Sequence, residues 1–147
     1  MTTQTQTGST DFKFDILSFE SLEDAPDGGS QYIVDTGESF RLRLRFTGSG
    51  VMWDNLEGLG LHYHVKFYAD GIGIPDELIL GEVFAELDPS GATTIYEPEL
   101  RVSIAKEGVY KCAATVFFFT ATHGPFHGLL GFTDDLVVFV HEHEEPK

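Results

Sequence analysis

The chain has 147 residues, with 24 acidic and 9 basic side chains and a formal net charge of −15 at pH 7. This length is typical of one compact domain, which buries about 70% of the surface that the unfolded chain exposes. The negative charge repels phosphate backbones and anionic lipid surfaces, so we expect no nucleic acid and no membrane among the partners.

Both ends of the chain are polar. Residues 1–10 include five threonines and have no apolar period, and the residues after 141 are mostly charged. We therefore predict a disordered segment at 1–10, one folded domain at 11–141 and a charged tail at 142–147. The single cysteine, Cys112, excludes an intrachain disulfide, and the start lacks a secretory pattern. Both features favour a soluble, cytoplasmic protein.

Short runs in which apolar and polar residues alternate, separated by Gly, Pro, Asp and Ser, follow one another along the chain. This period of two is typical of β-strands with one buried face, and no stretch has the period of an amphipathic helix. The predicted strands lie near residues 12–16, 40–46, 61–67, 78–87, 100–104, 110–120 and 136–140. This spacing predicts an all-β fold, a seven-stranded antiparallel sandwich of two sheets.

The strand at 40–46 carries arginines at alternate positions, and in a sandwich of this kind the strand at 100–104 is its neighbour. The resulting basic face consists of Arg41, Arg43, Arg45 and Arg101. We expect Glu82, Glu86 or Asp15 to neutralise it across strands, each exposed pair contributing about 0.2–1 kcal/mol. The alternative is a docking surface for an acidic partner.

The strand at 61–67 contains a His-x-His pair. His62 and His64 share one face because strand side chains alternate, so the simplest interpretation is that both face solvent. The connection after the strand at 110–120 carries His123 and His127, which sandwich topology places at the same end of the domain. Neutral imidazoles suit zinc or another transition metal. No carboxylate follows at the spacing of a known metal signature, so we expect no cofactor and keep a metal-binding protein as the alternative function.

The strands at 110–120 and 136–140 are more apolar than one buried face requires. With Tyr110 and Cys112 pointing inward, alternate residues such as Phe117 and Phe119 point outward. We expect a second subunit to cover this aromatic face, the alternatives being the chain's own loops or a stacked sugar. The predicted ligand- and partner-binding residues are Trp53, Asp54, Phe117, Phe119, Phe126 and Phe139.

The stretch Gly108-Val109-Tyr110-Lys111-Cys112 resembles the tyrosine corner of immunoglobulin-like domains, in which a tyrosine hydroxyl ties a strand connection to the backbone. With Thr36-Gly37-Glu38 entering the strand at 40–46, the layout is similar to the immunoglobulin-like carbohydrate-recognition domains attached to O-antigen export ATPases. The chain departs from antibody domains because leucine replaces the partner cysteine and Trp53 lies ahead of its usual strand. The resemblance implies an immunoglobulin-like sandwich and a recognition role toward a protein or carbohydrate ligand, and a shared fold alone does not identify a function.

Signatures of catalysis are missing from the sequence. The serines lack the context of a nucleophile elbow, and no glycine-rich loop precedes a helix. The acidic stretches, such as residues 70–77, lack the oxygen spacing of an EF-hand and are interpreted as solvated loops. We therefore predict a non-catalytic recognition or assembly module, a homo-oligomer that presents loops for a ligand or protein partner.

Overall fold

The structure, a computed structural model, describes all residues except 1–6, 10–11, 74–76, 121–123, 135 and 143–147, and for 7–9, 12, 120 and 124–130 it describes the backbone alone. The elements in these residues are β1 (Thr7–Ser9), β2 (Phe12–Glu23), β3 (Ile33–Asp35), β4 (Phe40–Ser49), α1 (Val51–Gly58), β5 (His62–Gly71), β6 (Glu77–Glu86), β7 (Glu99–Val102), β8 (Gly108–Thr120), β9 (Gly124–Phe132) and β10 (Leu136–His141).

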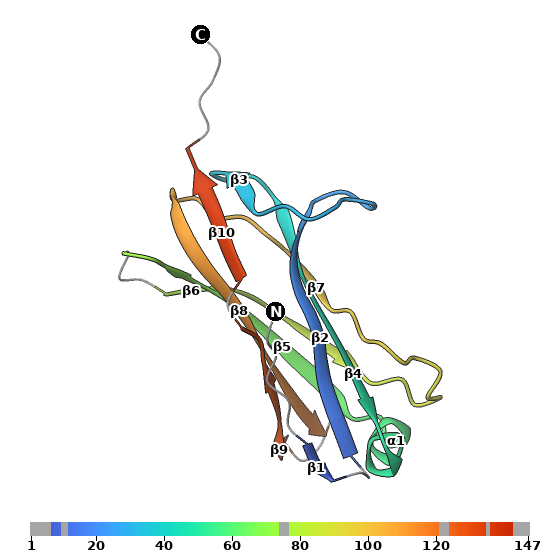
Figure 1. The fold of residues 1–147 in the computed structure, drawn as a ribbon. Helices are drawn as coiled ribbons and strands as arrows, with labels where there is room; N and C mark the ends of the chain where they lie inside the picture. The colour runs from blue at the N-terminus through green and yellow to red at the C-terminus, as the bar shows by residue number, and fades with distance from the viewer. Residues whose placement is uncertain (1–6, 10–11, 74–76, 121–123, 135, 143–147) are drawn as a thin grey trace.

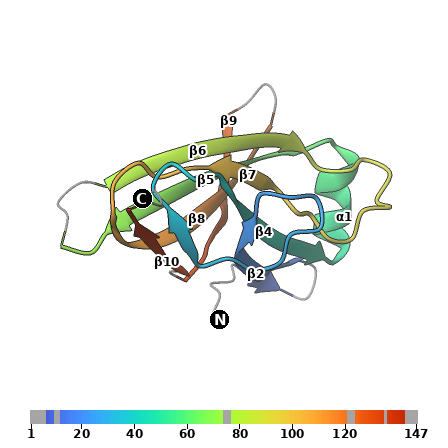
Figure 2. The same cartoon turned by 90° about the horizontal axis from the view of Figure 1, so that it is seen from above.

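The strands form two sheets that pack face to face (Figures 1 and 2). One sheet has the order β1-β2-β4-β7, and the other has the order β3-β10-β8-β5-β6. The long strand β8 shares one edge between two partners, because β10 pairs with its first half and β9 with its second half. Helix α1 closes the end of the sandwich shown at the bottom of Figure 1, and β3 lies at the opposite end. The chain is therefore a β-sandwich.

The alternating sequence pattern creates the core between the sheets. Every second residue of β4, from Phe40 to Phe46, is fully buried, and β5 shows the same alternation from Tyr63 to Ala69. The rings of Phe14, Phe46 and Phe118 meet edge to face at centroid distances of 5.2–6.0 Å. Aromatic pairs in this geometry add to the stabilisation from buried area.

All seven predicted strands are present, but the count of seven is wrong because ten strands occur among the described residues. The segment 7–9, predicted to be disordered, pairs with β2 as β1. The connection predicted around 122–128 is largely strand β9 from residue 124 onward. The eight-residue helix α1 was not predicted, because two turns are too short to establish a helical period.

The partner of β6 also differs from expectation. We expected the strand at 78–87 to lie in the sheet of the arginines, but β6 pairs with β5 and extends the other sheet. Glu82 and Glu86 therefore lie opposite Lys66 and His62 of β5 instead of the basic face. Alternation defines which face of a strand is buried, and it does not define which strand lies beside it.

The tyrosine corner is confirmed. The Tyr110 hydroxyl donates a hydrogen bond of 2.7 Å to the backbone carbonyl of Lys106, and Cys112 is fully buried two residues later. Burial raises the pKa of the Tyr110 phenol, because an enclosed phenolate loses its hydration.

The end of the core beneath α1 contains a buried carboxylate. Glu57 of α1 is 4% exposed, and its carboxylate accepts a 2.6 Å hydrogen bond from the Tyr96 hydroxyl. That hydroxyl in turn accepts a bond from the backbone N–H of Asp88. Burial and the bond to Glu57 raise the pKa of Tyr96. This chain of hydrogen bonds ties the helix to the loop that follows β6.

Candidate functional site

The outward side of the sheet β3-β10-β8-β5-β6, called here the outer face, carries both aromatic and charged side chains. Its side chains form rows across the strands, because cross-strand partners in register lie side by side. His64 lies in register with Phe84 on β6 and Phe117 on β8, and Asp70 lies in register with Glu77 and Lys111 on the same two strands. The two rows differ in character, one being aromatic and the other charged.

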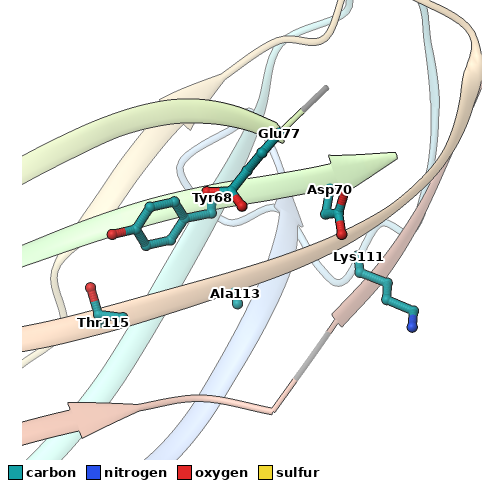
Figure 3. Close-up of a pocket in the computed structure, with 6 residues that line it drawn as sticks. All are labelled: Tyr68, Asp70, Glu77, Lys111, Ala113 and Thr115. Atoms are coloured by element: carbon teal, nitrogen blue, oxygen red, sulfur yellow. The ribbon is translucent and has the colours of Figure 1, made fainter. Parts of the chain in front are cut away.

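A hollow of about 440 Å³ lies on this face around the charged row (Figure 3). Its lining consists of Tyr68, Asp70, Glu77, Lys111, Ala113 and Thr115. The small residues Ala113 and Thr115 leave space over β8, and the Tyr68 ring extends along the hollow from β5. The volume is in the range of small-molecule binding sites.

A β-bulge in β6 positions one wall of the hollow. The register shifts so that Gly81 lies opposite Phe67 while Ile79 lies opposite Tyr68, which leaves Leu80 as the extra residue. A Cβ atom at Gly81 would lie 2.7 Å from Cδ2 of Leu100, so the bulge brings the β6 backbone close to β7. Without the extra residue, the parity of the strand would put Leu78 rather than Glu77 opposite Asp70. Bulges commonly redirect side chains in this way beside functional sites.

The charges in the hollow have no ion-pair partner among the residues that the structure describes. Elsewhere on the described outer face, Glu82 lies 3.4 Å from His64 and 3.7 Å from Lys66, and His141 lies 2.9 Å from Asp35. In contrast, Asp70, Glu77 and Lys111 form no ion pair within 4.0 Å among the described residues. The Thr115 hydroxyl oxygen is enclosed and also lacks a hydrogen-bond partner there. The hollow therefore collects polar groups that the described part of the chain leaves without partners.

The aromatic row surrounds the two histidines of β5. The His64 ring stacks on Phe84 at a centroid distance of 4.0 Å, and His62 meets Phe119 edge to face at 5.5 Å. His64 is largely covered, so the prediction that both histidines simply face solvent is wrong for His64. Its Nε2 atom lies 3.4 Å from a Glu82 oxygen without hydrogen-bond geometry, and this contact is an ion pair only when the ring is protonated.

The predicted metal site is only partly within the described residues. His123 and the side chain of His127 lie outside them, so the four-histidine site stays a prediction. Within the described part of the chain, no three His, Cys, Asp or Glu side chains are grouped to hold a metal ion. Along the outward side of β6, Phe84 lies between Glu82 and Glu86. It therefore separates the Glu82 carboxylate near His64 from the Glu86 carboxylate near His62.

The predicted ligand- and partner-binding residues do not form one site. Trp53 is 2% exposed and packs on Gly48 within the core, so its proposed contact with a ligand is wrong. Asp54 is exposed on α1, away from the outer face. Phe117 and Phe119 are half-buried beside the histidines, Phe139 of β10 is 49% exposed, and the Phe126 side chain lies outside the described residues.

The basic face is neutralised, as expected, but by other carboxylates. Arg43 lies 2.8 Å from Glu20 and 3.8 Å from Glu97, and Glu97 also lies 3.5 Å from Arg45. The remaining pairs, each at 3.0 Å, are Arg41 with Glu99 and Arg101 with Asp24. The expected partners Glu82 and Glu86 are wrong because β6 belongs to the other sheet.

The sequence contained part of the signal for the hollow. Tyr68 shares the outward parity of His62 and His64, and a glycine inside a strand pattern, such as Gly81, is typical of a bulge. Asp70 and Glu77 were interpreted as part of a solvated loop, but the structure places them in β5 and β6. Their meeting with Lys111 depends on strand register, which the sequence pattern does not specify.

Comparison with known proteins finds solved structures of similar fold but no matching sequence family. No protein-family model matches the chain, and no curated protein is significantly similar in sequence. The C-terminal domain of wzt aligns with a TM-score of 0.59 at 7% identity, over 97% of this chain and 80% of that one. The CARDB domain of the PF1109 protein from Pyrococcus furiosus, solved in complex with di-metal ions, aligns with a TM-score of 0.54 at 14% identity, over 93% of this chain and 100% of that one.

Identities this low establish a shared β-sandwich fold alone. In the part of the chain that the structure describes, no helix is long and apolar enough to cross a bilayer.

Proposed function

We propose that this chain is a non-catalytic recognition module that binds a saccharide in the hollow of the outer face. The observation that carries the proposal is the hollow itself, whose lining combines an aromatic ring with two carboxylates that have no ion-pair partner among the described residues, and with a lysine at its margin. Ligand sites typically combine an apolar or aromatic surface with a few polar groups that fix orientation. A sugar presents the matching pair of surfaces, because its ring has an apolar C–H face and hydroxyls at its rim.

The individual groups suit these surfaces. The Tyr68 ring offers a flat face for C–H groups, and the side-chain oxygens of Asp70 and Glu77 can accept hydrogen bonds from hydroxyls. Ala113 lets a ring approach the β8 backbone without steric conflict. Binding through these groups needs no metal or other cofactor.

The sequence resemblance supports the same function. The confirmed corner at Tyr110 favours an immunoglobulin-like topology, and the sequence layout is similar to the carbohydrate-recognition domains attached to O-antigen export ATPases. The fold is shared with the C-terminal domain of wzt. These likenesses favour recognition over catalysis, and the hollow supplies the local chemistry.

A saccharide panel tests the proposal by calorimetry or on an array. We expect at least one saccharide to bind, and Tyr68→Ala to weaken that binding about tenfold or more through the lost stacking surface. Phe84→Ala is the matched control, because Phe84 is an exposed aromatic of the same face outside the hollow. A chain that binds no saccharide contradicts the proposal, as does binding that depends on Phe84 but not on Tyr68. Chelator treatment should leave binding unchanged.

We also propose that copies of the chain associate through the apolar end of the outer face. Phe139 and Ile33 are register partners on β10 and β3, and they are 49% and 61% exposed. Phe117 and Phe119, which were also predicted in this contact, pack against the histidines of the same face and stay partly exposed. Light scattering over a concentration series tests the association. Ile33→Ser with Phe139→Ser should give monomers, Phe84→Ser should not, and a wild-type chain that is monomeric at high concentration would exclude it.

A further inference from the structure

The row Glu77–Asp70–Lys111 is unusual because it places two acidic side chains next to each other on neighbouring strands. Asp70 of β5 lies directly opposite Glu77 of β6, so two carboxylates are cross-strand neighbours. Like charges in this position destabilise a sheet. Other carboxylates of the described outer face lie beside a histidine or lysine, as Glu82 does, and the like-charge pair therefore calls for an explanation beyond folding.

Lys111 carries one positive charge, so it can offset only one of the two negative charges of Asp70 and Glu77. It lies in register with Asp70 on the side away from Glu77, and neither carboxylate is within 4.0 Å of a described cation. Figure 3 shows the Lys111 side chain extending away from Tyr68, whereas the Glu77 side chain points toward Tyr68. The part of the hollow next to the ring is consequently acidic, in a chain whose net charge is −15.

We propose that the saccharide held in the hollow carries a protonated amine, which lies between the Asp70 and Glu77 carboxylates and against the face of the Tyr68 ring. This inference rests on the saccharide-binding function proposed above. An ammonium group donates up to three hydrogen bonds, is attracted by both carboxylates and interacts favourably with an aromatic face. A ligand of this kind removes the repulsion between Asp70 and Glu77.

A divalent metal ion fits the same groups less well. Calcium takes six to eight oxygen ligands and magnesium takes six, and the hollow offers two carboxylates with Thr115. No set of three metal-ligating side chains occurs among the described residues. An amine is fully satisfied by two carboxylates and a ring, so the groups present match its needs.

Three tetrasaccharides with the same β-1,4-linked glucose backbone give a matched test. They carry a free amine, an acetylated amine or a hydroxyl at C2. The comparison is made at about pH 6, where a primary amine is protonated. We expect the tetramer with free amines to bind at least tenfold more tightly than the other two, and the difference to shrink as salt is added.

Variants separate the charge from the rest of the site. Asp70→Asn and Glu77→Gln should each remove most of the preference for the amine, whereas Glu86→Gln, a carboxylate on the same face outside the hollow, should keep it. Equal binding of all three tetramers, or tightest binding of the acetylated or hydroxylated one, overturns the inference and leaves the proposed function standing. The same holds if none of the three binds but another saccharide does. Failure to bind any saccharide overturns both.

Discussion

The two outward sheet faces use their charges in opposite ways. On the sheet β1-β2-β4-β7, each of the four arginines lies within 3.8 Å of a carboxylate from a neighbouring strand or loop. On the outer face, Asp70 and Glu77 lie opposite each other without a described cation in contact. The first arrangement is explained by stability. The second costs stability, and the binding function proposed above offers a reason for that cost.

The same contrast separates the aromatic residues. Trp53 stacks with Phe14 at a centroid distance of 6.3 Å and is buried, although the sequence suggested a ligand contact. Phe84 is 60% exposed on an edge strand. Aromatic character alone therefore did not separate residues that support the fold from residues available to a partner.

The largest expected effect comes from the buried member of this pair. Trp53→Ala should lower the free energy of unfolding by about 3–5 kcal/mol, because it removes a large side chain and leaves a cavity. Phe84→Ala should cost less than about 1 kcal/mol, since most of its ring is already in water. Denaturant titration measures both. Similar losses for the two variants would contradict the division into core and outer face.

The buried carboxylate beneath α1 gives the next largest effect. Tyr96→Phe removes the hydroxyl that donates to Glu57, which should cost about 1–3 kcal/mol because the buried carboxylate loses a donor. Tyr32→Phe is the control, since Tyr32 is a partly exposed tyrosine outside this network. A denaturation midpoint unchanged in Tyr96→Phe would show that the bond contributes nothing.

This network also predicts a pH dependence. The pKa of Tyr96 is raised in the folded state, so its contribution is fully present below the unfolded value near 10. The contribution is lost as the pH rises above that value toward the folded pKa. Stability should therefore fall above about pH 10, and the fall should be smaller in Tyr96→Phe. Thermal unfolding of both proteins over this pH range measures the fall. An equal fall in the wild-type protein and in Tyr96→Phe would assign the effect to other groups.

Sequence patterns predicted the parts of the fold that depend on local alternation. In β4, the residues from Phe40 to Phe46 alternate between the core and the outer surface as predicted, and the tyrosine corner at Tyr110 is present. The hollow depends on non-local facts, namely the sheet that β6 joins and the extra residue at its bulge. A one-residue change in register moves a side chain to the opposite face, so Glu77 could not be placed beside Asp70 from the sequence.

A smaller effect is expected on the basic face. Glu20→Gln removes the 2.8 Å partner of Arg43, and both side chains are partly covered. We expect a loss of about 0.5–1 kcal/mol, which added salt should reduce. Unfolding measured at low and high ionic strength provides the test. A loss that persists unchanged in high salt would indicate packing rather than charge.

The smallest expected effect has the opposite sign and separates the two faces most directly. Asp70→Asn removes one of two opposed carboxylates, so it should leave stability unchanged or raise it by about 0.2–0.5 kcal/mol. Lys111→Gln should lower it slightly, because Lys111 is the cation in register with Asp70. These signs follow from the charges alone and need no ligand, so denaturant titration of the free protein measures them. If Asp70→Asn instead destabilised the chain as Glu20→Gln does, the hollow carboxylates would be structural and the two faces would be equivalent.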